Sequence, residues 1–290
     1  MANAGARLAP YAFILLWSSS FVTARVGLAL VSPLLFVAVR LVAAAALFAV
    51  ALAVRRQSLA PLRRRWHHLA LAGVLVNGIT LSAFHVGMVT ENVAVMALLQ
   101  TLSPMLIAVA AVPLLGERLR PRQWLGLALG AVGVVLVVAP RALEGPAAWG
   151  AVRLGFVGAV SLAAGTLYFG RFGRDVPLVP ATAVQLGAAA IVTVVLTIVF
   201  EHPHAVWTFP AVASVAWNVL AVSVGAMALY YYMLSHGTAG RVAANFYLIP
   251  GTVALLGWVL LGERISLLTA LGFAVASVGV FLVARRQLDE

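Results

Sequence analysis

The sequence predicts an all-α polytopic membrane protein, with ten transmembrane helices arranged as two inverted five-helix repeats. Three observations predict this class: the composition, an internal repeat and the distribution of arginine. Of the 290 residues, 63% are hydrophobic and only 9% are charged, whereas soluble domains carry about 25% charged residues. The composition therefore favours a chain that is mostly embedded in lipid.

An internal repeat organises the chain. Residues 93–138 recur as 239–284, and Pro104 matches Pro250, so the offset between the copies is 250 − 104 = 146 residues. At this offset the segment LLGER occurs in both copies, and so does a pair of glycines seven residues apart. Matching proline and Gly-Glu-Arg positions are unexpected from apolar composition alone. We interpret the chain as one five-helix unit written twice.

The two repeats are expected at residues 1–143 and 144–290. Each contains five apolar runs of roughly the 20 residues that a helix needs to cross a bilayer. The ten expected helices are at residues 8–28, 33–54, 67–89, 93–114, 121–139, 149–170, 178–200, 211–235, 240–261 and 266–284.

Glycines at corresponding positions predict two structural features. Gly116 and Gly262, in the two LLGER segments, are expected to end helices, because glycine readily adopts the left-handed conformation found there. The pair Gly126 and Gly133, and its counterpart Gly272 and Gly279, are expected to let the fifth and tenth helices pack closely. Their partner is either each other or another protomer.

The basic residues indicate the orientation in the membrane. All 19 are arginines, and most lie between apolar runs, so we interpret them as membrane topology signals and expect no nucleic-acid partner. With the N-terminus inside, 14 arginines fall in cytoplasmic segments and four fall outside. Both termini are therefore expected in the cytoplasm. Because each repeat has an odd number of spans, the two copies enter the membrane from opposite sides.

Several classes of protein are disfavoured. The chain has no cysteine, no HExxH segment and no paired carboxylates within a span, so we expect neither an enzyme nor a bound cofactor. Glu201, His202 and His204 have metal-ligand side chains, but Pro203 interrupts them and a solvated turn without metal is expected. Inverted repeats are instead a common plan of secondary transporters, with the substrate site near mid-membrane.

The doubled unit resembles the EamA-type branch of the drug/metabolite transporter superfamily over nearly the whole chain. The resemblance is carried by LWSSSFVTARVGL at 16–28, Pro33 followed by Arg40, Pro104 followed by LLGER, and the repeated glycines. It implies a multi-pass protein of a bacterial inner membrane that exports amino acids, their analogues or other small metabolites. It is similar to aromatic amino-acid exporters. The second half departs from the pattern, because Leu186 corresponds to Arg40 and Ala163 to Trp17.

Two helical faces are candidate walls of a substrate cavity. Helix periodicity places five residues of the third helix on one face, and the 146-residue offset transfers this face to the eighth helix. The alternative is ordinary helix packing with incidental hydrogen bonds. The residues are Asn77, Leu81, Phe84, His85 and Met88 in the third helix, and Ser223, Met227, Tyr230, Tyr231 and Leu234 in the eighth.

Further candidates lie in the first, fourth, sixth and ninth helices. Pro104 and Pro250 are expected to kink corresponding helices, and such matched interruptions indicate a transport site; a kink that serves packing alone is the alternative. The flanking and facing candidates for substrate binding are Trp17, Ser20, Gln100, Ser103, Thr166, Phe246 and Tyr247.

Three ionisable residues have open roles. Arg40 lies about two turns inside the second helix and is expected either to bind a substrate carboxylate or to lock this helix to a neighbour. His85 and Glu91 are candidates for a coupled proton. For Glu91, the alternative of a solvated turn residue is favoured.

The sequence thus predicts a secondary transporter that exports small metabolites by alternating access. Amino acids or analogues with an apolar or aromatic part are the expected substrates. The alternatives are an uncoupled facilitator and an exporter of another drug-like metabolite. The expected partners are the small-molecule substrate and the lipid bilayer, and a monomer is sufficient.

Overall fold

The computed structural model describes residues 4–115, 119–143, 145–173, 176–226, 229, 233, 248–264 and 266–284. Eight helices in this part are long and apolar enough to cross a membrane, and two shorter apolar helices follow. The polytopic helical class predicted from the sequence is therefore confirmed.

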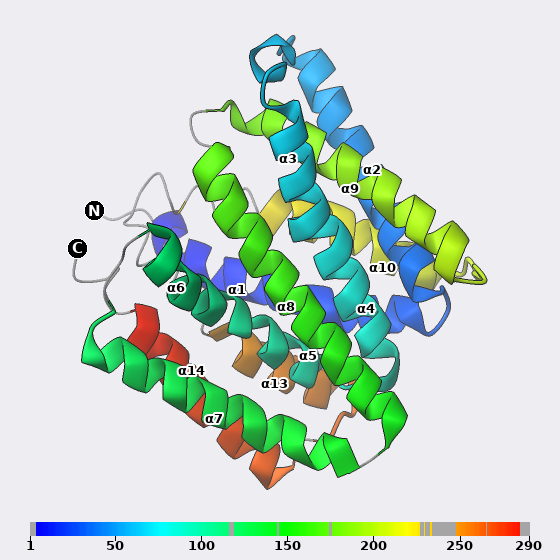
Figure 1. The fold of residues 1–290 in the computed structure, drawn as a ribbon. Helices are drawn as coiled ribbons and strands as arrows, with labels where there is room; N and C mark the ends of the chain where they lie inside the picture. Colours follow the sequence, from blue (N-terminus) through cyan, green and yellow to red (C-terminus); the bar gives the residue numbers. More distant parts are fainter. Residues whose placement is uncertain are drawn as a thin grey trace.

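The first half begins with α1 and ends with α7 (Figure 1). Three consecutive elements, α3, η2 and α4, make one span, and α5 and α6 make another that is interrupted at Thr101. The elements are α1 (Ala4–Leu28), α2 (Pro33–Val54), η1 (Ala60–Leu62), α3 (Trp66–Gly73), η2 (Val74–Ile79), α4 (Thr80–Thr90), α5 (Val93–Gln100), α6 (Leu102–Leu115) and α7 (Pro121–Leu143).

The second half has the same sequence of spans in the described residues. Most helices begin and end within a few residues of the predicted positions, but the eighth and ninth expected spans extend into residues 227–247, which are almost entirely outside the described part. The elements are α8 (Pro146–Phe172), α9 (Leu178–Phe200), α10 (Phe209–Trp217), η3 (Asn218–Ala226), α13 (Ile249–Leu261) and α14 (Leu267–Ala284).

Proline and glycine set several helix ends. Pro33, Pro121 and Pro146 are the first residues of α2, α7 and α8, where the missing N–H has no intrahelical partner to lose. Gly262 follows α13 with a left-handed backbone, φ 67° and ψ 19°. The expectation that glycine ends a helix is confirmed for Gly262, whereas Gly116 lies outside the described residues.

Two spans contain π-helical segments at corresponding positions. These are η2 (Val74–Ile79) and η3 (Asn218–Ala226). Adding the repeat offset of 146 to positions 74 and 79 gives 220 and 225, which fall inside η3. In a π-helix the hydrogen-bonding pattern is locally widened, and such segments frequently occur at functional sites.

The helices α7 and α14 lie side by side over their length (Figure 1). A Cβ atom at Gly133 would lie 2.6 Å from the carbonyl oxygen of Gly272, and one at Gly279 would lie 2.5 Å from that of Gly126. Only glycine permits this approach of the two backbones. The sequence left open whether these glycines contact each other or another protomer, and in this structure they contact each other.

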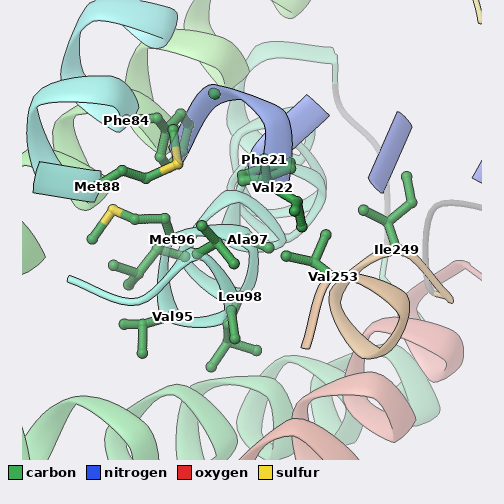
Figure 2. Close-up of a cluster of buried hydrophobic side chains, with 14 of the residues drawn as sticks. Phe21, Val22, Phe84, Met88, Val95, Met96, Ala97, Leu98, Ile249 and Val253 are labelled. Atoms are coloured by element: carbon green, nitrogen blue, oxygen red, sulfur yellow. The ribbon is translucent and has the colours of Figure 1, made fainter. Parts of the chain in front are cut away.

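The core is centred on α5. All residues from Val93 to Leu99 are buried, as expected for a helix that is surrounded by other helices. Its neighbours include α1, α4, α8 and α13. Figure 2 shows Met96 and Leu98 within this cluster, together with Val253 from α13.

Candidate functional site

Arg40 is a charged residue that is buried within a membrane span. It lies within α2, its side chain is only 8% exposed, and its Nε atom has no hydrogen-bond partner. No hydrogen bond or ion pair from Arg40 to another described residue is found. A lock between Arg40 and a side chain of a neighbouring helix, one of the two roles expected from the sequence, is therefore not seen in the described part.

His85 lies beside Arg40 on the neighbouring helix α4. Its ring stacks on Phe36, with centroids 5.6 Å apart and planes at 27°. Phe36 precedes Arg40 by one helical turn on α2, so the His85 ring lies close to the level of Arg40. The Nδ1 atom is 2.7 Å from the carbonyl oxygen of Leu81, so Nδ1 is the donor. The buried Nε2 atom has no partner.

Asn218 is a functional candidate that the sequence analysis missed. It is fully buried and is the first residue of η3. Its Nδ2 group donates to Thr23 Oγ1 of α1 and to the carbonyl oxygen of Ser214, both at 3.0 Å, while its Oδ1 atom has no partner. An amide within an apolar span was the available signal, but the repeat offset transferred only the face between residues 77 and 88, and Asn218 corresponds to Ala72, outside that face.

The residues of the predicted face on the third helix pack against several different helices. Leu81 packs with the apolar residues shared by α2 and α9, whereas Phe84 lies against Gly158 of α8. Met88 belongs to the main core in Figure 2. Asn77 is half-buried within η2. In this conformation these side chains contact neighbouring helices.

The candidates of α1 and α8 form local hydrogen bonds. Trp17 is half-buried and packs at an angle on Phe13, with centroids 5.6 Å apart. Ser20 Oγ donates to the carbonyl oxygen of Trp17 at 2.6 Å. Thr166 is exposed, and its hydroxyl donates to the carbonyl oxygen of Leu162 at 2.7 Å.

The candidates around Pro104 lie where one span is interrupted. Gln100 ends α5 and is half-buried, and Thr101 interrupts the helix. Ser103 is buried, and its hydroxyl donates to the carbonyl oxygen of Ala159 at 3.0 Å. Pro104 lies in the first turn of α6, after the interruption, and Pro250 lies correspondingly in the first turn of α13. Pro104 thus directly follows the interruption of its span, whereas residues 234–247, which precede α13, lie outside the described part.

Five of the predicted substrate-binding residues, as well as Leu234, lie outside the described residues. The five are Met227, Tyr230, Tyr231, Phe246 and Tyr247.

The glutamates at helix ends correct two expectations. Glu91, expected in a solvated turn, is only 3% exposed, because the end of α13 covers this region and Glu263 Oε1 accepts the Val93 backbone N–H at 3.2 Å. Glu201 was also expected in a solvated turn. It is half-buried, and its carboxylate accepts hydrogen bonds from Ser32 Oγ at 2.8 Å and from the backbone nitrogens of Leu34 and Leu35. These N–H groups begin α2 and have no intrahelical acceptor.

An apolar groove of about 650 Å³ lies between α1, α13 and α14. None of the predicted site residues within the described part lines it. The lining residues are Tyr11, Ile14, Leu15, Leu248, Gly251, Thr252, Leu255, Ser277, Val278 and Phe281.

The fold and the buried polar groups together define a class. A multi-pass helical membrane protein whose corresponding spans are interrupted, and whose spans enclose unpaired polar side chains, has the architecture of a transport protein. The chain belongs to the EamA-like transporter family, whose sequence profile matches residues 8–139 and again residues 149–285.

Relatives agree with this assignment. The uncharacterized inner membrane transporter YedA of Escherichia coli strain K12 is 27% identical over 279 residues, which cover 94% of this chain and 88% of the relative. An uncharacterized transporter of Archaeoglobus fulgidus is 26% identical over 281 residues, which cover 94% of this chain and 95% of the relative. A crystal structure with 24% identity superposes with a TM-score of 0.67, covering 97% of this chain and 98% of that one, and shows the same fold.

Proposed function

We propose that this protein is a secondary transporter that exports amino acids or analogues with an apolar or aromatic part, by alternating access. The observation that carries the proposal is the pair of π-helical segments, η2 and η3, which overlap when one half is shifted by the 146-residue repeat offset. Interruptions in corresponding helices of two halves indicate where a transporter binds its substrate. Buried polar groups lie directly beside both segments, at Ser82 and His85 and at Asn218.

The contacts between helices support an arrangement of two inverted repeats. The approach of Gly133 to Gly272 becomes, under exchange of the halves, the approach of Gly279 to Gly126, and both occur. Exchange of two similar halves between two conformations would open one site to each side of the membrane in turn.

The orientation in the proposal follows from the arginines. With both termini cytoplasmic, the exposed arginines 63–65 before α3 face the cytoplasm, as the positive-inside rule requires. The protein acts in the bacterial inner membrane on a small-molecule substrate, without enzymatic chemistry, and a single chain is sufficient.

An uncoupled facilitator is the second candidate. It is favoured by the positions of the described carboxylates, since Glu91, Glu201 and Glu263 all lie at helix ends. A proton carried on a carboxylate midway along a described span is therefore not available. Transport that ignores a pH gradient and never concentrates substrate would identify the facilitator.

The test is counterflow with the purified protein in liposomes. Vesicles loaded with unlabelled phenylalanine are diluted into a panel of labelled amino acids, sugars and organic cations, with protein-free vesicles as the control. We expect transient accumulation of labelled amino acids with apolar side chains. Exchange restricted to cations or sugars would contradict the substrate class.

A further inference from the structure

We propose that Arg40, His85 and Asn218 form a buried subsite for the zwitterionic head group of the substrate, with Arg40 binding the carboxylate. This inference rests on the proposed function and names the chemistry by which an α-amino acid is recognised. Three helices contribute to the subsite: α2, α4 and the helix formed by α10 and η3.

The first step is the cost of the isolated charge. The Arg40 side chain is 92% removed from solvent, since 8% is exposed, and it makes no hydrogen bond or ion pair with a described residue. A buried, uncompensated charge strongly destabilises a protein, and charges within spans face a partner or a polar cavity. The structure therefore requires a counter-ion for Arg40.

The second step is that none of the described acidic residues lies at this depth. Glu201 binds the start of α2 at Leu34, and Arg40 lies six residues further along, which is about 9 Å at 1.5 Å per residue. Glu91 and Glu263 lie at other helix ends. The remaining five acidic residues are outside the described part, and in the sequence they fall between expected spans or after the last one: Glu117, Glu144, Asp175, Asp289 and Glu290.

The third step is that three helices meet at one level of the structure. A Cβ atom at Gly27 of α1 would lie 3.0 Å from the Ser214 Cβ atom and would overlap with the Phe36 ring. The helices α1, α2 and α10 therefore meet at this level. Because only four residues separate α1 from α2, these two helices run in opposite directions.

The next level lies one helical turn farther from the connection between α1 and α2. There α1 carries Thr23, α2 carries Arg40, and the helix formed by α10 and η3 carries Asn218. The hydrogen bond from Asn218 Nδ2 to Thr23 Oγ1 at 3.0 Å shows that these residues share a level. His85 extends this level from α4, because its ring stacks on Phe36, one helical turn before Arg40. Four helices thus direct polar groups into one layer.

The unpaired atoms of this layer match an amino-acid head group. A guanidinium binds a carboxylate through two parallel hydrogen bonds. Asn218 Oδ1 is an unpartnered acceptor, and His85 Nε2 is another in the neutral ring, since Nδ1 donates to Leu81. Both acceptors suit an ammonium group. Ser82 Oγ, also buried and unpaired, adds a hydroxyl on α4.

The subsite lies beside both π-helical segments, and this position suggests how the substrate reaches it. Asn218 begins η3, and Ser82 and His85 follow η2 on the same span. The groups are packed together in this conformation, so the substrate enters when α2 separates from its neighbours. Motion at the two interrupted spans would provide this separation.

The experiment compares phenylalanine with phenylalanine amide, which lacks the carboxylate charge, in counterflow with purified protein. Wild type is expected to prefer phenylalanine by about tenfold or more, the range for charge-assisted hydrogen bonds. Arg40→Gln is expected to lose this preference, and Arg40→Lys, which keeps the charge without the planar fork, to retain part of it. Arg153→Gln removes an exposed arginine of α8 and should match wild type.

Each possible result either supports or overturns the proposed subsite. Equal exchange of both compounds by wild type overturns the subsite and leaves the proposed exporter intact. An undiminished preference in Arg40→Gln also overturns the subsite. A wild type that exchanges no amino acid overturns the exporter and the subsite together. If Arg40→Gln does not fold, Arg40→Lys decides, and an unchanged preference in a folded Arg40→Lys overturns the role of the guanidinium fork.

Discussion

Glu201, the residue after α9, places carboxylate Oε1 3.0 Å from the backbone nitrogen of Leu34 at the start of α2. The adjacent backbone nitrogen of Leu35 donates to Oε2 at 2.9 Å. A carboxylate here accepts N–H groups that the helix cannot satisfy itself and interacts favourably with the helix dipole. One residue of the second half therefore fixes the beginning of a helix in the first half.

Glu201→Gln should destabilise the protein by about 1–3 kcal/mol, the cost of weakening charge-assisted hydrogen bonds to buried N–H groups. The melting temperature of purified protein in detergent measures this effect. His202→Gln is the matched control, because His202 is the next residue and is exposed. Equal melting temperatures for the two variants would contradict the role of Glu201.

Gly133→Ala should destabilise the contact between α7 and α14 by about 1–3 kcal/mol through overpacking. The added methyl group would lie 2.5 Å from the backbone nitrogen of Ala276, and a backbone atom cannot move aside as a side chain can. Gly150→Ala in α8, where a Cβ atom meets nothing within 4 Å, should be neutral or stabilising by up to about 1 kcal/mol. If both variants have the same melting temperature in detergent, the close approach of α7 and α14 is absent from the purified protein.

The inverted arrangement predicts that Arg120 and Ser266, which follow the two LLGER segments, lie on opposite sides of the membrane. Each is exposed, and the chain contains no native cysteine, so single cysteines can be introduced without interference. An impermeant thiol reagent should label Ser266→Cys in intact cells and Arg120→Cys only after the membrane is opened. Equal labelling in intact cells would refute the inversion.

Trp17→Ala combined with Tyr231→Ala should lower the tolerance that overexpression confers toward toxic aromatic amino-acid analogues. Aromatic pairs contribute about 0.5–1.5 kcal/mol beyond burial, so loss of two should weaken substrate binding several-fold or more. Growth inhibition at matched protein level is the measurement. Trp124→Ala, at a residue that is 53% exposed on α7, should have no effect, and an equal loss there would assign the effect to stability.

Much of the fold could be predicted from the sequence because a bilayer constrains it strongly. Spans must be about 20 apolar residues long, so α2 and α9 match the expected ranges 33–54 and 178–200. The glycine pairs were informative for a similar reason, since only a missing side chain allows α7 and α14 to approach so closely. Both features depend on local composition.

The candidate site was harder to predict because one helical face contacts several partners. Leu81 packs toward α2 and α9, while Phe84, three residues later, packs on α8. Periodicity places residues on a face, but the arrangement of neighbouring helices decides what each residue meets. Asn218 was missed because its importance lies in an unpaired atom, which no sequence pattern reveals.

The sequence by itself determined most of the spans, the 146-residue repeat and which helices carry glycines for close packing, because hydrophobic length and residue size act locally, but it left the partner of those glycines open. Only the tertiary structure decided which groups the charged side chains contact. Glu201 and Glu263 contact helix starts 167 and 170 residues away, at Leu34 and Val93, whereas Arg40 is buried without an acidic partner among the described residues. Such pairings follow from satisfying buried N–H groups and charges in three dimensions, and residues far apart in the chain supply the partners.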